Sequence, residues 1–195
     1  MKVVKKILKL LLLNMIWLLF CLPVITLGAS TAAAFSVTLK MAKDEEVILW
    51  KQFIKGFRQS FLQGMFMGFF TSGCCVATIF LWKRILEDPS FFPVVGGVMF
   101  TLTVILLNFF AFPLIARYEN SFKNVIKNSV SIFVQFFQPS LMAVIVVAVE
   151  VLIIYISKKV FFVTLLFMPV LIFYTISLTA KDCFDKLEQT HKNSQ

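Results

Sequence analysis

The sequence predicts an all-α membrane protein: a polytopic bundle of about six transmembrane helices with amphipathic helices along the cytoplasmic surface, and five spans as the alternative. Of the 195 residues, 59% are hydrophobic and 15% are charged, with a mean hydropathy of +0.90. A soluble domain carries roughly 25% charged residues. The apolar residues also form runs long enough to cross a bilayer, which takes about 20 residues per helix. We therefore expect a single integral membrane domain over residues 1–195.

The longest apolar run, residues 10–42, is interrupted by Pro23 and Gly28 and is too long for one ordinary crossing. Proline removes a helix donor and glycine permits a turn, so a helical hairpin is expected over about residues 7–42. One long helix is the alternative. The returning helix is rich in Ala, Ser and Thr, which lets helix backbones approach closely in lipid.

The remaining elements follow from breaks in the apolar pattern. Over about residues 44–61, aromatic residues recur at three- and four-residue steps opposite a basic face, which is typical of a helix lying on a membrane surface. Gln135, Gln138 and Pro139 indicate an interfacial start or a kink before the fifth span. The later spans are expected at about 62–82, 93–116, 137–157 and 161–180, before a polar tail, 181–195, that holds His191.

Small residues at four-residue steps form a ridge along the third predicted span, a pattern typical of close helix packing. Packing within the chain is the favoured interpretation, and contact with a second copy or a partner is the alternative. The candidate packing residues are Gly28, Ser60, Gly64, Gly68 and Ser72.

The distribution of Lys and Arg predicts that both termini are cytoplasmic. With a hairpin at the N-terminus, fifteen basic residues fall on one side, in 1–9, 40–61, 117–129 and 181–195. Four fall on the other: Lys83, Arg84, Lys158 and Lys159. The net charge of +9 therefore indicates topology and attraction to anionic lipid headgroups rather than nucleic-acid binding.

No motif for catalysis is present: there is no phosphate-binding glycine loop, no GxSxG and no HExxH. We expect no catalytic residue, cofactor or metal. Glu150 is the one clearly ionisable side chain inside a predicted span, where a carboxylate is costly and is a functional candidate by default. Asn14 and Asn108 are conceivable partners. A structural polar contact, a partner or substrate contact, and proton coupling are the roles open to it.

The two basic aromatic segments, 40–61 and 117–129, form a candidate cytoplasmic docking surface. A solvated face anchored to lipid is the simpler interpretation, and docking to another membrane protein or to a soluble subunit is the sharper one. The candidate residues are Trp50, Phe53, Phe57, Arg58, Arg117 and Lys123.

Three stretches carry a family resemblance: NMIW followed by LPVITLGAS and three alanines within residues 14–34, WKQFIKGFRQSFLQG over 50–64, and more weakly 113–129. They resemble the YesL-like family, bacterial integral membrane proteins grouped as a domain of unknown function. The resemblance implies a small multi-pass protein in the plasma membrane of Gram-positive-type bacteria. Its genes typically lie beside carbohydrate importers of the ATP-binding-cassette (ABC) type and glycan-processing enzymes. No reaction is established for the family, so no catalytic residue is implied.

The leading hypothesis is a non-enzymatic accessory subunit that contacts the permease subunits of a carbohydrate ABC importer and aids its assembly or regulation. The alternative is an independent small-solute transporter or channel that uses Glu150, in a homodimer for example. An intramembrane enzyme or a signalling adaptor forms a third class, and the enzyme lacks a candidate nucleophile with a base.

Overall fold

The computed structural model describes residues 2–118, 121–156 and 161–193, and all regular structure in them is helical. The predicted outer lysines Lys158 and Lys159, and the side chain of His191, lie outside the described part. The helices are α1 (Lys2–Cys21), η1 (Val24–Thr26), α2 (Leu27–Ala42), α3 (Leu49–Gln59), α4 (Phe61–Glu87), α5 (Phe91–Phe109), α6 (Ala111–Arg117), α7 (Phe122–Gln135), α8 (Phe137–Ile156) and α9 (Phe161–Asn193).

The chain reverses direction between α1 and α2, in a short turn that contains Pro23 and η1. Contacts at both ends of the pair show the reversal. Near the turn, Trp17 Nε1 donates to Thr31 Oγ1 over 3.3 Å. At the far end, Lys6 Nζ lies 2.9 Å from Asp44 Oδ1. The stretch is therefore an antiparallel hairpin and not one long helix.

Helix α2 is the centre of the fold. Every residue from Gly28 to Leu39 is buried, and the helix contacts α1, α3, α4, α6 and α9. A helix that is buried on all sides needs small side chains where its neighbours come close, and α2 is built largely from Ala, Ser and Thr. The small residues of the returning helix thus explain why five helices can surround it.

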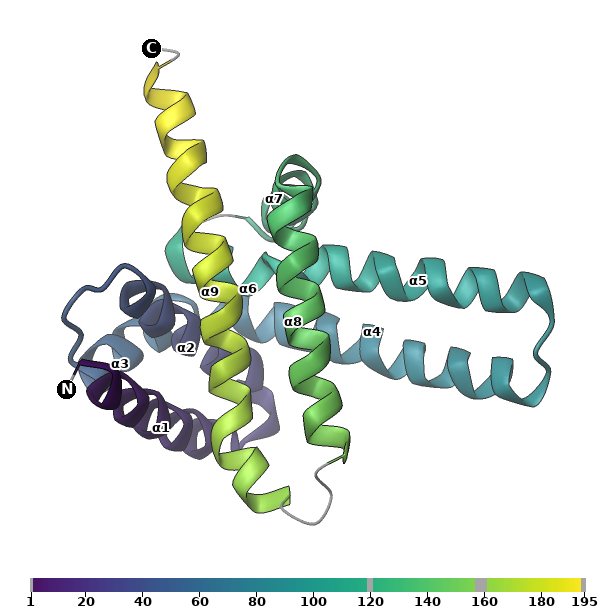
Figure 1. Cartoon of the computed structure of the whole chain (residues 1–195), viewed down its shortest axis with the longest axis horizontal. Coiled ribbons are helices and arrows are strands. Elements are labelled where there is room, and N and C mark those ends of the chain that lie inside the picture. The colour runs from purple at the N-terminus through teal and green to yellow at the C-terminus, as the bar shows by residue number, and fades with distance from the viewer. Residues whose placement is uncertain (1, 119–120, 157–160, 194–195) are drawn as a thin grey trace.

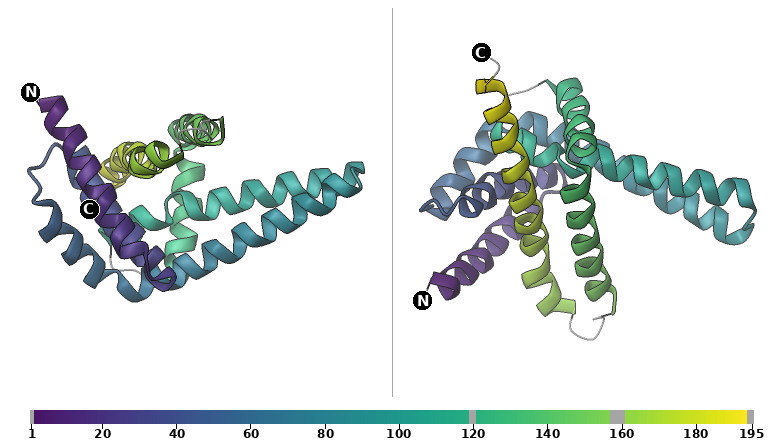
Figure 2. Two further views of the ribbon diagram at one scale, coloured as in Figure 1. Left: turned by 90° about the horizontal axis from the view of Figure 1, so that it is seen from below. Right: turned by 45° about the horizontal axis from the view of Figure 1, so that its top comes forward.

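Two long hairpins leave this centre in different directions, as Figure 1 and both views of Figure 2 show: α4 with α5, and α8 with α9. We call residues 72–102, the outer part of the first hairpin, the arm. Every residue of the arm is described, and only Ile85 and Gly97 are buried, against each other. Trp82 Nε1 also donates to Thr101 Oγ1 over 3.0 Å. The arm thus closes on itself and leaves its outer faces uncovered.

A side chain from α7 explains the break between α5 and α6. Ser129 Oγ donates to the carbonyl of Leu106 over 3.2 Å and accepts from the N–H of Phe110 over 3.3 Å. These are the two groups that an unbroken helix would join directly. Pro113 removes the next donor for the carbonyl of Phe109. An inserted side chain and a proline are both recognised causes of a helix break.

The predicted kink before the fifth span is a bend of 101° between Phe122–Gln135 and Phe137–Ile153. Pro139 lies in the first turn of α8, where a missing N–H costs no helix hydrogen bond. The bend lays α7 across the base of the α4–α5 hairpin, against α5 and α6.

Several helices could span a membrane, consistent with a multi-pass membrane protein. Among the described residues four stretches are long and apolar enough: Val24–Ala42, Phe61–Glu87, Phe91–Arg117 and Phe167–Gln189. The bent pair of α7 and α8 would make a fifth. Helix α1, which begins KVVKKILK, is not among them. The count of six spans stays a prediction.

Candidate functional site

The glycines of the small-residue ridge meet α2 directly. A β-carbon on Gly28 would collide with the carbonyl oxygen of Gly64 and would lie 2.7 Å from the Cα of Gly68. Ser60 is buried and donates from Oγ to the carbonyl of Gly56 over 2.6 Å, whereas Ser72 is exposed. Gly28, Gly64 and Gly68 therefore form one contact inside the chain, and Ser60 and Ser72 do not take part in it.

The predicted docking surface does not form as a unit, because Phe53 and Phe57 pack against the core while Trp50 stays exposed. Phe53 is 0% exposed. Its ring centroid lies 5.2 Å from that of Phe20, and the centroid of Phe57 lies 5.1 Å from the same ring. The buried face of α3 thus belongs to the core beside α1 and α2. Phe53 is part of that core and is not available for docking, and Phe57 is half-buried beside it. Of the α3 residues predicted there, Trp50 and Arg58 are exposed.

The predicted polar residues of the membrane interior are not brought together either. Asn14 is buried on α1. Asn108 Oδ1 accepts from Thr71 Oγ1 over 2.5 Å, a contact within the α4–α5 hairpin. Glu150 Oε1 accepts from Thr175 Oγ1 of α9 over 3.0 Å, and Glu150 Oε2 is buried without a hydrogen-bond partner among the described residues. Asn108, one of the two conceivable partners of Glu150, is thus bonded to Thr71 instead, and the described contact of Glu150 is with Thr175.

Charged side chains from α2, α6 and α9 meet at one end of the fold. Arg117 Nη2 lies 3.2 Å from Asp185 Oδ1 and 2.8 Å from Glu188 Oε1, and Lys43 Nζ lies 3.0 Å from Asp185 Oδ1. Because the Arg117 side chain is only 17% exposed, it is committed to the fold and is not a free docking residue. Lys123, the last residue predicted for that surface, is exposed on α7. These ion pairs join segments 40–61, 117–129 and 181–195, which the distribution of basic residues predicts to share a side.

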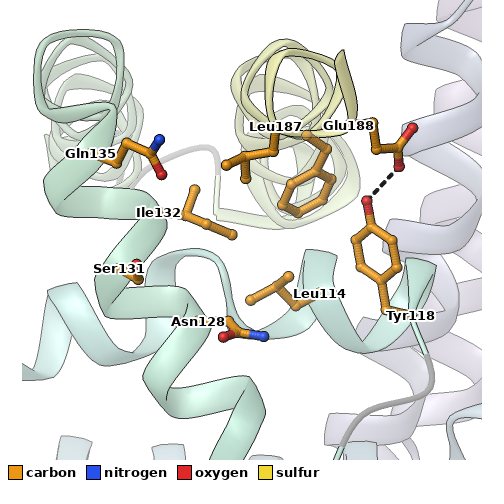
Figure 3. A pocket seen from close by; sticks show the side chains of 9 residues that line it. Leu114, Tyr118, Asn128, Ser131, Ile132, Gln135, Leu187 and Glu188 are labelled. Atoms are coloured by element: carbon orange, nitrogen blue, oxygen red, sulfur yellow. Dashed lines mark hydrogen bonds between the residues drawn. The ribbon is translucent and has the colours of Figure 1, made fainter. Parts of the chain in front are cut away.

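A polar recess of about 420 Å³ opens beside this ion-pair cluster (Figure 3). Asn128, Ser131 and Gln135 line it from α7, and Glu188 lines it from α9. Tyr118 Oη donates to Glu188 Oε1 over 2.6 Å. Burial, and then this hydrogen bond, raises the pKa of Tyr118 to about 12, so the phenol remains a donor at neutral pH.

A second, basic recess of about 260 Å³ lies between the end of α2, one stripe of α3 and the end of α6. We call it the basic recess. Arg117 lines it, and the Nη1 atom of this residue is buried without a hydrogen-bond partner among the described residues. Leaving such a donor unpaired costs about 1–3 kcal/mol or more. The lining residues are Ser36, Leu39, Lys40, Lys43, Glu45, Gln52, Lys55, Gln59, Ala116 and Arg117.

A third recess, of about 490 Å³, lies where the base of the arm meets α8 and α9. We call it the apolar corner. Asn108 and Thr31 lie in its wall, but Glu150 does not. Six of its apolar lining residues are Ile105 and Phe109 of α5, Val144, Val147 and Val151 of α8, and Phe173 of α9.

Among the described residues, no group of three or more His, Cys, Asp or Glu side chains is placed to hold a metal ion. The recesses offer an apolar groove, a cluster of cations and a partly polar wall, which are features that binding sites use.

One comparison with known proteins gives a match. Residues 10–81 match the family model described as "Protein of unknown function, DUF624". Neither a curated protein nor a solved structure matches the chain. The match runs from α1 into α4, so it covers the hairpin, α3 and the glycine contact of α2 with α4. It supports a domain of unknown function and assigns no activity.

Three structural residues escaped prediction from the sequence. Gly56 lets α3 approach α2, because a β-carbon there would collide with the side chain of Ser36. Ser129 bridges the break after α5. Asp185 joins two cations across three helices. Gly56 and Ser129 could have been found from the sequence, since each is a small residue that interrupts the apolar stripe of an amphipathic helix and so marks a close contact. The partners of Asp185 depend on the tertiary fold alone.

Proposed function

We propose that the chain is a non-enzymatic accessory subunit in the bacterial plasma membrane, which binds the permease subunits of a carbohydrate ABC importer through its arm. The observation that carries the proposal is the exposure of the arm. Its uncovered large apolar side chains are Val76, Ile79, Phe80, Leu86, Phe91, Phe92, Val95, Val98, Met99, Phe100 and Leu102.

The divergence of the two hairpins favours a protein partner over lipid alone. Helices that merely cross a bilayer pack side by side in a bundle. Here the arm stands apart from α8 and α9 (Figure 1), and the apolar corner lies between them. A transmembrane helix of a permease laid in this corner would contact the base of the arm on one side and Val147 of α8 on the other. Helix-in-groove docking of this kind relies on apolar contacts.

The class of partner rests on sequence resemblance. The stretches that resemble the YesL-like family lie largely within residues 10–81, which match a family model of unknown function. YesL-like genes typically lie beside carbohydrate importers, and this neighbourhood is an association rather than a physical argument.

Affinity purification from native membranes in a mild detergent, followed by mass spectrometry, tests the proposal. Importer permeases are expected in stoichiometric amounts with the wild-type protein. They should be lost when Phe80 and Met99 on the arm are both replaced by Ala. The matched control replaces Leu12 and Met15, which are also exposed, on α1, and should retain the permeases. Recovery of the protein without permeases, or equal recovery with the arm variant, would contradict the proposal.

The environment of Glu150 supports a second candidate, an independent transporter of small solutes. An intramembrane carboxyl with one buried oxygen that has no hydrogen-bond partner among the described residues resembles the groups that couple ions in transporters. Purified protein in liposomes should then move a solute, and Glu150→Gln should abolish the flux. Equal flux from the wild-type protein and from this variant, or no flux above that of empty liposomes, would exclude this role.

A further inference from the structure

We propose that the basic recess binds a phosphate group, carried either by an anionic phospholipid headgroup or by a small soluble phosphate. This inference does not depend on the accessory role. It rests on the charge of the recess, on its hydrogen-bond donors, and on its size and position.

Positive charge exceeds negative charge in the wall of the recess. Four cations line it, and Glu45 is the one acidic side chain among the lining residues. Asp185 pairs with two of the cations, Lys43 and Arg117, and Glu188 also pairs with Arg117. Lys40 and Lys55 have no carboxylate partner among the described residues: Lys40 Nζ donates to Gln52 Oε1 over 3.0 Å. Two ammonium groups are therefore left for an anion.

Only some of these cations are accounted for by stabilisation of helix ends. Lys40 lies in the last turn of α2 and Arg117 in the last turn of α6, where cations interact favourably with the free carbonyl groups. Lys55 lies in the middle of α3, where no helix end requires a cation. It shares a stripe of that helix with Gln52 and Gln59, and all three line the recess.

The donors of the recess suit phosphate. Arg117 lines the recess, and its Nη1 atom has no hydrogen-bond partner among the described residues. Guanidinium groups bind phosphate oxygens with strong, directional hydrogen bonds. Because Gln52 Oε1 accepts from Lys40, the amide nitrogen of Gln52 remains a donor. The recess therefore combines ammonium, guanidinium and amide donors around one space.

The size of the recess suits a phosphate group, and its position favours a lipid headgroup as the source. Its volume of about 260 Å³ is below the range of roughly 300–1,000 Å³ for pockets that hold drug-sized ligands. It lies at the end of α2 and α6 where the ion pairs gather, the part of a membrane protein that meets headgroups. Basic pockets between transmembrane helices at this level bind anionic headgroups.

Binding to the purified full-length protein, in a neutral detergent, tests the proposal by native mass spectrometry and calorimetry. The probes are short-chain phosphatidylglycerol, short-chain phosphatidylcholine, glycerol phosphate and inorganic phosphate. We expect saturable binding of phosphatidylglycerol, with phosphatidylcholine much weaker. Failure of both soluble phosphates to bind would assign the site to a lipid headgroup. Soluble phosphates that bind as tightly as the lipid would assign it to a free phosphate.

Variants connect the binding to the recess. Lys40→Gln and Lys55→Gln should each weaken binding about fivefold, the effect of about one Lys–headgroup contact. The charge-matched control is Arg58→Gln, exposed on the same helix and outside the recess, and should bind as the wild-type protein does. Gln59→Lys adds a cation to the wall and should tighten binding, a gain that misfolding cannot produce. Absence of saturable binding by every probe, or equal binding by wild type and Lys55→Gln, would overturn the proposal.

Discussion

Gly28 of α2 packs against Gly64 of α4 with no space for a side chain between the two backbones: a β-carbon on Gly28 would collide with the carbonyl oxygen of Gly64. Both residues lie in the stretch that matches the family model, residues 10–81. That stretch also contains the contact of Gly56 with Ser36 and the packing of Phe53 on Phe20. The matched segment is thus held together by contacts of its own.

Gly28→Ala should destabilise the protein by about 2–3 kcal/mol, because overpacking against a backbone cannot be relieved by a rotamer change. Thermal unfolding in detergent, followed by size-exclusion chromatography, measures the loss. Gly73→Ala is the control on α4, where a β-carbon would meet nothing within 4 Å, and it should be neutral or stabilising. Equal stability of the two variants would show that α2 and α4 are not in contact here.

Ser129→Ala should cost about 1–3 kcal/mol, because it leaves the carbonyl of Leu106 and the N–H of Phe110 unpaired in an apolar environment. Ser131→Ala, on the exposed face of the same helix, should change stability by less than about 0.5 kcal/mol. The same unfolding assay compares them. If Ser129→Ala were as stable as Ser131→Ala, the bridge would not hold the break between α5 and α6.

Phe53→Ala should cost about 3–5 kcal/mol, because the ring is fully buried. Trp50→Ala, on the exposed face of α3, removes one edge contact with Phe20 and should cost about 1 kcal/mol. Unfolding midpoints of the two variants report the difference. A Phe53→Ala protein as stable as the wild type would show that the ring is not part of the core, and would support the docking role that the sequence suggests for Phe53.

Asp185→Asn should loosen the C-terminal part of α9, since it removes the carboxylate shared by Lys43 and Arg117. The effect on stability should be about 1 kcal/mol and should shrink as the salt concentration rises. Hydrogen exchange of the backbone amides in α9 reports the loosening. Asp182→Asn, an exposed neighbour whose nearest described ion-pair distance is 4.0 Å, is the control and should leave exchange unchanged.

The fold class and the central helix were accessible from the sequence. Apolar runs indicate membrane helices, and Pro23 with Gly28 locates the reversal, because bilayer thickness and backbone sterics act locally. The contact of Gly28 with Gly64 and Gly68 follows the small-residue rule as well.

The candidate site was less accessible, because it depends on which faces meet. From the sequence alone, the aromatic face of α3 could bind a partner or pack in the core. The contact of Phe53 with Phe20, which only the tertiary structure shows, places Phe53 in the core. The described partner of Glu150 is Thr175 on the neighbouring helix α9, and no motif marks this residue in the sequence. Residues of three helices line the basic recess, so no single stretch of the sequence predicts it.

Site-specific photo-crosslinking in native membranes tests the accessory role most directly. A photoreactive residue is placed at Phe80 or at Met99 on the arm, and at Leu12 on α1 as the control; all three positions are exposed. The account predicts adducts with importer permeases from the two arm positions and none from Leu12. Lipid adducts alone from Phe80 and Met99 would contradict it, because the arm would then face only the bilayer.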